Sequence, residues 1–246
     1  FFKGLGTRNA YGSSTQDCSN KFAVAERMYG SAIHQPVPDL KRTQMVILIG
    51  TNPAISQMSF VHTPNAVDTL LGIEARGGRV VHVNPRRTET AERVGEQVFI
   101  RPDTDVFFLL SFLQVMFAEH DPGAVPHVRG LSELRALVAP YSPERTEAVT
   151  RVPAGTLREL VAAFLSARGA SVYASTGLNM GRSGSVGIWL VNAINVLSGN
   201  LDREGGAIVP HGMFPLATVA HHTGFGRGHQ RSRVGDFEAV LDQMPG

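Results

Sequence analysis

The sequence predicts an α/β fold in which a mainly parallel sheet is covered by helices on both faces. Four short segments are apolar, rich in β-branched residues and bounded by turn residues; they are 45–49, 79–83, 97–101 and 171–175. Segments with helical periodicity separate them. Strands that alternate with helices of about 10–15 residues indicate βαβ units, and near-continuous apolar strands indicate a sheet that is buried on both sides. We therefore expect a doubly wound, Rossmann-like sheet.

Each predicted helix has apolar residues at helical spacing, and most have a recognisable end. The predicted helices span 62–78, 103–118, 152–169 and 185–200. Gly77 and Gly78 end the first, Gly169 ends the third, and Pro153 suits the first turn of the third. The intervening region 119–150 is interpreted as a lid or a small helical insertion.

The chain has 246 residues, which is enough for one large domain or a domain and a half. From residue 207 the periodic pattern gives way to Gly, Pro and His. We therefore predict an α/β domain over 1–206 and the truncated start of a following domain over 207–246. Because the first residue is Phe and the end reads LDQMPG, we expect a piece of a longer protein.

Composition excludes several classes of function. The net charge is +2 without a lysine-rich block, so no nucleic-acid partner is expected. All but three of the 23 basic residues are arginine, which suits bidentate contacts with phosphates or carboxylates. The longest apolar stretch, 106–117, is shorter than the ~20 residues of a membrane span. With no visible signal peptide, a cytoplasmic location is expected.

Cys18 is the only cysteine. An internal disulfide, a cysteine-rich zinc site and an iron–sulfur cluster held within this chain are therefore excluded. The segment 221–233 contains three histidines, and we interpret it as a solvated loop in preference to a zinc site.

The carboxyl ends of the predicted strands should form one site. Right-handed crossovers place these ends on one edge of a parallel sheet, and ligands of such folds bind there. The four strand-end loops read Gly50-Thr51-Asn52-Pro53, Asn84-Pro85-Arg86-Arg87-Thr88, Arg101-Pro102-Asp103-Thr104-Asp105 and Thr176-Gly177-Leu178-Asn179.

The first loop has the chemistry of an anion site. Gly50 allows a sharp exit from the strand and a close backbone approach. Thr51 or Asn52 can cap a following helix, and Pro53 suits its first position. We therefore expect bare backbone N–H groups at this helix N-terminus.

The other loops complete a site for a nucleoside diphosphate. Arg86 and Arg87 add positive charge, while Asp103 and Asp105 can accept hydrogen bonds from the N–H edge of a purine such as guanine. Two rival nucleotide templates are absent, since the sequence has neither G-x-G-x-x-G after a strand nor G-x-x-x-x-G-K-[ST].

Four stretches, in order, resemble the molybdopterin oxidoreductases of the dimethyl sulfoxide reductase family, which includes formate dehydrogenases and periplasmic nitrate reductases. The stretches are VILIGTNPAISQMSF, ARGGRVVHVNPRRTETAERV, FIRPDTDVFFLL and LVNAINVLSGNLDREGGAI, and the resemblance covers roughly residues 1–210. It implies a region that binds molybdopterin guanine dinucleotide (MGD), one of two that flank a molybdenum or tungsten atom in a two-electron oxidoreductase.

The resemblance also implies partners and roles. The two Asn-Pro turns would hold the diphosphate and ribose of MGD, with Gly50, Asn52 and Pro53 at the diphosphate. Asn84 and Arg86 would meet the ribose or phosphate, and Asp103 or Asp105 the base. The remaining domains of the polypeptide, an electron-transfer subunit and a small-molecule substrate are the expected partners. An iron–sulfur cluster would lie outside this chain, so we expect the chain alone to be inactive.

Two positions bear on the metal and the substrate. Cys18 lies 32 residues before Gly50, near where the family places its metal-coordinating cysteine, selenocysteine, serine or aspartate. The resemblance thus makes Cys18 the candidate catalytic metal ligand, with Asp17 as its rival. Where formate dehydrogenases carry an arginine past a Gly-Gly turn, this chain reads Val209-Pro210-His211-Gly212, which argues against formate as substrate.

Two other interpretations remain open. One is a degenerate, non-catalytic scaffold subunit that keeps this fold without the metal. The other is the central nucleotide-binding domain of a thiamine-diphosphate enzyme, whose sheet also ends in Gly- and Arg-containing loops.

Overall fold

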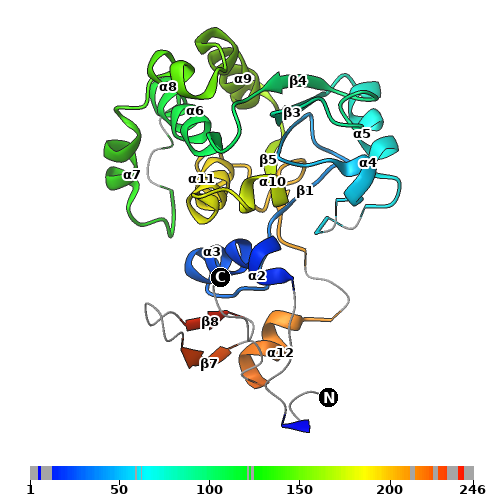
Figure 1. Ribbon diagram of the computed structural model, residues 1–246, viewed down its shortest axis with the longest axis vertical. Helices are drawn as coiled ribbons and strands as arrows, with labels where there is room; N and C mark the ends of the chain where they lie inside the picture. Colours follow the sequence, from blue (N-terminus) through cyan, green and yellow to red (C-terminus); the bar gives the residue numbers. More distant parts are fainter. Residues whose placement is uncertain are drawn as a thin grey trace.

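A four-stranded parallel sheet forms the centre of the computed structural model (Figure 1). The structure describes residues 5–6, 13–58, 60–61, 63–120, 122, 125–210, 214–223, 227–231 and 238–240. The sheet has the order β4-β3-β2-β5, with β2 at Met45–Ile49, β3 at Arg79–Asn84, β4 at Glu96–Phe99 and β5 at Ala170–Ala174. All four predicted strands are confirmed. β4 ends at Phe99, two residues before the predicted end. The N–H of Ile100 still donates to the Asn84 carbonyl of β3 (3.4 Å), whereas the N–H of Arg101 donates to the carbonyl of Thr150 (2.8 Å), outside the sheet.

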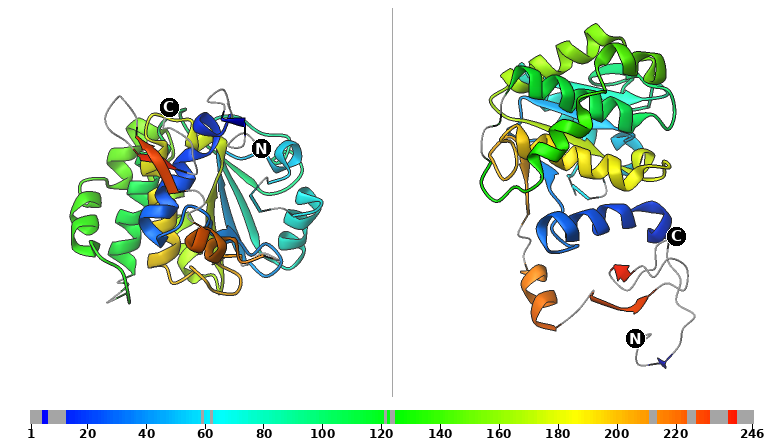
Figure 2. Two further views of the ribbon diagram at one scale, coloured as in Figure 1. Left: turned by 90° about the horizontal axis from the view of Figure 1, so that it is seen from below. Right: turned by 90° about the vertical axis from the view of Figure 1, so that its left-hand side faces the viewer.

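Helices cover both faces of the sheet, as predicted (Figure 2, left). One face carries α4 (Pro53–Ser56) and α5 (Ala66–Ala75); the other carries α6 (Asp105–Glu119), α9 (Ala154–Ser166) and α11 (Gly184–Leu197). Side chains of β2 alternate between two cores: Val46 packs into the smaller core under α5, and Ile47 into the larger core under α6, α9 and α11. Alternation follows from the two-residue period of a strand.

The strand order has a reversal beside β2. The chain runs from β2 to β3 and β4 on one side, and then returns to place β5 on the other side of β2. Met45 pairs with Arg79 of β3 and with Ala170 of β5, so the three strands end at nearly the same level. At such a reversal the loops that follow the two neighbouring strands, here β2 and β5, diverge and open a crevice at the carboxyl edge, where ligands of such sheets bind.

The region between α6 and α9 is a helical insertion and not a lid. It contains α7 (Leu131–Val138) and α8 (Pro143–Thr150), both packed against α6. Leu134 and Val138 are buried and belong to the larger core. These helices therefore stabilise the face of the sheet that α6 covers.

The N-terminal helices lie beside the sheet, next to the carboxyl-edge loops (Figure 1). They are α2 (Ser14–Asp17) and α3 (Ser19–Tyr29), and α3 runs along α11, where Tyr29 donates to Asn192 Oδ1 (2.9 Å). The remaining elements are β1 (Val37–Pro38), α10 (Thr176–Asn179), β6 (Ala207–Ile208), α12 (Leu216–Thr223), β7 (Arg227–Arg231) and β8 (Glu238–Val240). None of the helices in the described ranges is long and apolar enough to cross a membrane.

Two predictions concern the C-terminal part. β6 pairs antiparallel with β1, which joins residues 207–208 to the N-terminal part of the chain; the domain boundary after residue 206 stays a prediction. Of the segment Val209–Gly212, residues 211 and 212 lie outside the described residues, as do 224–226 and 232–233 of the histidine-containing segment. The described residues of that segment belong to α12 (221–223) and β7 (227–231), so the prediction of a loop is wrong for them.

His82 on β3 makes the stability of the fold depend on pH. It is buried, its Nε2 lies 3.0 Å from the carbonyl of Val94, and its Nδ1 has no hydrogen-bond partner among the described residues. Burial lowers the pKa of His82 below its ordinary value of 6.5. The unfolded chain therefore binds the proton more readily, so the stability present above pH 6.5 is lost as the pH falls below it.

We expect urea unfolding to show a smaller free energy of unfolding at pH 5 than at pH 8. His82→Gln keeps a donor for the Val94 carbonyl but cannot gain a proton, so its free energy should fall less over the same range. An equal fall in the variant and the wild type would contradict this assignment.

Candidate active site at the carboxyl edge of the sheet

A cavity of about 340 Å³ lies at the carboxyl edge, where the strand order reverses. Its volume falls in the range of about 300–1,000 Å³ that small-molecule sites occupy. It is lined by Gly50, Thr51, Asn52, Ile55, Ser56, Asn84, Pro85, Arg86, Thr88, Pro102, Asp103, Asp105, Ser175, Thr176 and Gly177. Most of the sequence-predicted residues are thus brought together; Pro53, Thr104, Asn179 and Cys18 are not among the lining residues.

Gly50 and Gly177 bring the ends of β2 and β5 into backbone contact. Gly50 has φ +58°, and a Cβ at this position would lie 2.7 Å from the amide nitrogen of Leu178. A Cβ on Gly177 would lie 2.8 Å from Cα of Gly50, and the Gly177 N–H donates to the Gly50 carbonyl (3.0 Å). The close approach predicted for Gly50 is therefore made, within the chain, to Gly177. Side chains are excluded here because backbone fills the space.

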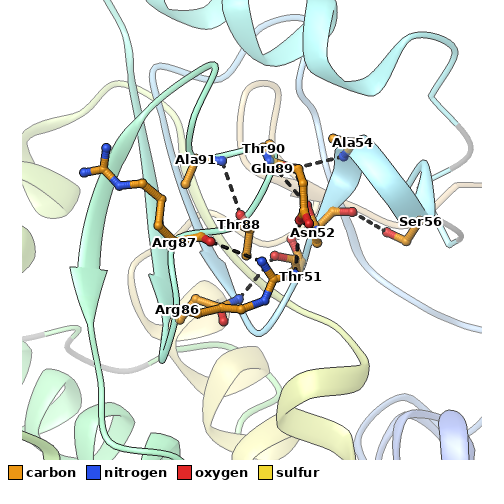
Figure 3. A network of polar contacts seen from close by, with 11 residues as sticks. Thr51, Asn52, Ala54, Ser56, Arg86, Arg87, Thr88, Glu89, Thr90 and Ala91 are labelled. Atoms are coloured by element: carbon orange, nitrogen blue, oxygen red, sulfur yellow. Dashed lines mark hydrogen bonds and ion pairs between the residues drawn. The ribbon is translucent and has the colours of Figure 1, made fainter.

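Asn52 links the loop after β2 to the loop after β3 (Figure 3). Its Nδ2 donates to Glu89 Oε2 (2.6 Å), and its Oδ1 accepts from Thr90 Oγ1 (2.8 Å). The Thr90 hydroxyl in turn accepts from the N–H of Ala54 (2.9 Å). The expectation of bare N–H groups at the start of α4 is therefore wrong for Ala54, because a threonine from the neighbouring loop occupies that donor. Pro53 does take the first turn of α4, as predicted.

Arg86 lines the cavity and is held at both terminal nitrogens. Nη2 donates to Glu89 Oε2 (3.1 Å) and Nη1 to the carbonyl of Arg87 (3.1 Å). The N–H of Glu89 itself, followed by Asn52 and Arg86, lowers the pKa of the Glu89 carboxyl to about 2. Sequence reasoning missed Glu89 and Thr90. The signal available was an acidic residue three positions after Arg86.

The two aspartates of the third loop differ in their surroundings. Asp103 has φ +62°, and its Oδ1 accepts the N–H of Arg182 (2.9 Å). Asp105, in the first turn of α6, is half-buried; burial and then the charge of Asp103 raise the pKa of its carboxyl. Thr104 faces its own loop, since its hydroxyl donates to the carbonyl of Arg101 (2.7 Å). Asp103 is thus tied to the loop after α10, and Asp105 is the desolvated carboxyl at the cavity.

Asp17, which precedes Cys18, contacts α10, the short helix that follows β5. Thr176 Oγ1 donates to Asp17 Oδ1 (2.9 Å), and Asn179 Nδ2 donates to the Asp17 carbonyl (3.2 Å). Thr176 also lines the cavity, so the turn that carries both candidate metal ligands adjoins it. Burial and then the charge of Asp17 raise the pKa of the Cys18 thiol. Whether Cys18 or Asp17 binds a metal stays a prediction.

Asn179 fastens the Asp17–Cys18 turn, and its predicted contact with the cofactor stays a prediction. Asn20 contributes from the other side, donating to the Asn179 carbonyl (2.7 Å). Asn179→Ala should free the turn to open and raise the rate at which a thiol reagent modifies Cys18, which is only 9% exposed, by about tenfold, the effect of one lost buried hydrogen bond. Because Cys18 is the only cysteine, mass spectrometry of the labelled chain measures the rate directly.

The matched control for this labelling is Asn192→Ala. It removes the hydrogen bond between α11 and Tyr29, at the opposite end of α3, and should leave Cys18 slow to react. Equal labelling rates in wild type and Asn179→Ala would show that Asn179 does not hold the turn.

Comparison with known proteins finds relatives that agree with one another in their class. No family model matches the chain. Formate dehydrogenase H of Escherichia coli is 22% identical over 213 residues, which cover 82% of this chain and 29% of that protein. The thiosulfate reductase molybdopterin-containing subunit PhsA of Salmonella typhimurium is 26% identical over 215 residues, which cover 82% of this chain and 26% of that subunit.

The fold has a counterpart among solved structures. Acetylene hydratase from Pelobacter acetylenicus superposes with a TM-score of 0.67 at 22% identity, covering 80% of this chain and 26% of that protein. The chain therefore spans little more than a quarter of the length of these relatives. The α/β fold and the ordered strand-end loops agree with these comparisons. The chain is a homologue of the molybdopterin oxidoreductases of the dimethyl sulfoxide reductase family.

Proposed function

We propose that this chain binds the guanosine diphosphate part of MGD within a bis-MGD molybdenum or tungsten oxidoreductase that carries out a two-electron reaction. One observation carries the proposal: the cavity at the strand-order reversal is lined by residues from the ends of all four strands of the parallel sheet. Gly50 follows β2, Asn84 ends β3, Asp105 follows β4 and Gly177 follows β5. A long ligand laid across this edge contacts each loop in turn.

The lining residues fit a diphosphate. Arg86 supplies a guanidinium, whose planar N–H groups match phosphate oxygens. Thr51 belongs to the lining, and its Oγ1 is buried without a hydrogen-bond partner among the described residues. An unpaired buried hydroxyl destabilises a protein by about 1–3 kcal/mol. A polar ligand that gives the Thr51 hydroxyl a hydrogen-bond partner would offset that penalty. The Gly50–Gly177 contact keeps side chains out of the space between β2 and β5.

Asp105 is assigned to the base, ahead of Asp103. An Asp103 oxygen already accepts from the backbone of Arg182, whereas the Asp105 carboxyl is desolvated at the cavity. Guanine offers adjacent N–H donors on one edge, which a carboxylate accepts. Adenine offers no N–H at the corresponding ring nitrogen, so Asp105 would favour guanine.

The metal centre is assigned to the Asp17–Cys18 turn, with Cys18 as ligand. A thiolate is a soft ligand and suits a metal already surrounded by the sulfurs of two pterins. When bound, the cofactor supplies a metal that exchanges two electrons with a small-molecule substrate. The chain's own residues then hold the nucleotide ends and position the ligand turn. The remaining domains, an iron–sulfur cluster outside this chain and an electron-transfer subunit complete the proposed enzyme, and the isolated chain is inactive.

Calorimetric titration of GDP and ADP into the full chain tests the nucleotide assignment. We expect GDP to bind at least about tenfold more tightly than ADP, a difference of about 1.4 kcal/mol, and Asp105→Asn to remove most of this preference. Equal affinities, or no binding of GDP, would contradict the proposal. Metal and pterin analysis of the protein from a host that makes MGD addresses the scaffold alternative, which requires that both be absent.

A further inference from the structure

Glu89 stands behind two residues of the cavity wall and contacts both through one atom. Its Oε2 accepts from Asn52 Nδ2 (2.6 Å) and from Arg86 Nη2 (3.1 Å). Asn52 comes from the loop after β2, and Arg86 from the loop after β3. Both line the cavity, whereas Glu89 does not. A single carboxylate oxygen therefore joins two loops that the backbone ladder leaves separate (Figure 3).

The guanidinium of Arg86 needs such an anchor. The Arg86 side chain is 60% exposed, and an arginine side chain carries about 2 kcal/mol of rotamer entropy. The Glu89 carboxylate fixes Nη2, and the Arg87 carbonyl fixes Nη1. An arginine whose two terminal nitrogens are already hydrogen-bonded loses little further side-chain entropy when it binds an anion. This is the general advantage of preorganisation.

Asn52 is oriented by the same contact. Its amide donates to Glu89 and accepts from Thr90, and the Thr90 hydroxyl satisfies the N–H of Ala54. The contacts form a continuous chain from Arg86 through Glu89, Asn52 and Thr90 to the start of α4. Without Glu89, the amide of Asn52 loses its acceptor, and the chain of contacts is cut in the middle.

We propose that Glu89 is a positioning residue for the part of the cavity wall that Asn52 and Arg86 form. It holds the Arg86 guanidinium and the Asn52 amide in the orientation that receives an anionic group. This inference rests on the proposed nucleotide function. A carboxylate placed so near an anion site has an opposing effect, since it repels the anion. The position of Glu89 outside the cavity lining, with solvent screening the exposed charges, makes positioning the dominant effect.

The test compares Glu89→Ala with Glu89→Gln in the GDP titration. Alanine removes the acceptor, and we expect the Kd of GDP to rise about five- to tenfold. Glutamine keeps an oxygen that accepts from the same two donors, so its Kd should stay within about twofold of wild type. A role as a repelling charge predicts the opposite, because both variants would then bind GDP more tightly. Tighter or unchanged binding in Glu89→Ala overturns the proposal.

A second measurement separates this inference from the proposed function. The Nε–H signal of Arg86 in ¹⁵N NMR, assigned with Arg86→Lys, reports the order of the side chain without any ligand. We expect an ordered signal in wild type and Glu89→Gln, and an averaged one in Glu89→Ala. If GDP fails to bind wild type while this pattern holds, the nucleotide assignment fails and the positioning role stands. An Arg86 signal that is equally ordered in Glu89→Ala overturns the positioning role itself.

Discussion

Replacing Gly50 by alanine is expected to lower the free energy of unfolding by about 2–4 kcal/mol. The expectation has two additive causes. At φ +58° a side chain strains the backbone, at roughly 1 kcal/mol. The new Cβ would also lie 2.7 Å from the Leu178 nitrogen and 2.9 Å from Cα of Gly177, and both belong to backbone that cannot move aside alone. The ends of β2 and β5 must separate to accept it.

Two matched variants isolate these causes. Gly77→Ala has φ +77° with nothing within 4 Å of the added Cβ, so it should lower stability by only about 1 kcal/mol. Gly177→Ala has no positive φ to strain but would place its Cβ 2.8 Å from Cα of Gly50, and should retain the steric part. Urea denaturation followed by circular dichroism measures all three. A loss in Gly50→Ala no larger than that in Gly77→Ala would show that the close approach contributes nothing.

Separating the ends of β2 and β5 should also change the shape of the cavity. Gly50 and Gly177 both line the cavity at the point where the strand order reverses. A backbone shift that admits a methyl group would move Thr51, which follows Gly50, away from Thr176, which precedes Gly177; both threonines line the cavity. We therefore expect Gly50→Ala and Gly177→Ala to bind GDP more weakly even at temperatures where they remain folded.

The arrangement of the sheet was predictable because it rests on rules that act through sequence pattern. Short, continuous apolar segments such as 45–49 are typical of strands that are buried on both faces of a parallel sheet. Because the crossovers between parallel strands are right-handed, the carboxyl ends of these strands lie on one edge of the sheet. The strand-end loops followed from that, so Gly50, Arg86 and Asp105 could be grouped from sequence alone. The same pattern predicted helices on both faces.

Side-chain direction at the edge was not predictable, because it depends on which partners the loops meet. Asn52 turns to Glu89 and Thr90, which are distant in sequence, and Thr90 takes the N–H that seemed bare. Asp103 adopts a positive φ and meets the backbone of Arg182, 79 positions away. Asn179 turns to the Asp17 carbonyl. Each of these contacts joins two loops, and no periodicity within one loop contains that information.

The contrast between Arg86 and Arg87 provides the sharpest test of the cavity as a nucleotide site. The two residues are adjacent and carry the same charge, yet only Arg86 lines the cavity. The side chain of Arg87 extends away from the polar network in Figure 3, and only its carbonyl takes part, as an acceptor for Arg86. Any effect of general positive charge should therefore be shared by the two, and any effect of direct contact should belong to Arg86.

We expect Arg86→Ala, in protein from a host that makes MGD, to retain pterin about 10- to 100-fold less well than wild type, because hydrogen bonds to charged groups contribute about 1.5–3 kcal/mol. Arg87→Ala keeps the carbonyl that holds Arg86 and should retain pterin as wild type does. Pterin content per chain after dialysis measures retention, and activity per bound pterin, taken separately, should change much less, because Arg86 holds the nucleotide end and does not touch the reacting atoms. Equal pterin content in Arg86→Ala and wild type would remove Arg86 from the site. Equal losses in both variants would assign the effect to net charge, since Arg87 has no contact with the cavity through which to act.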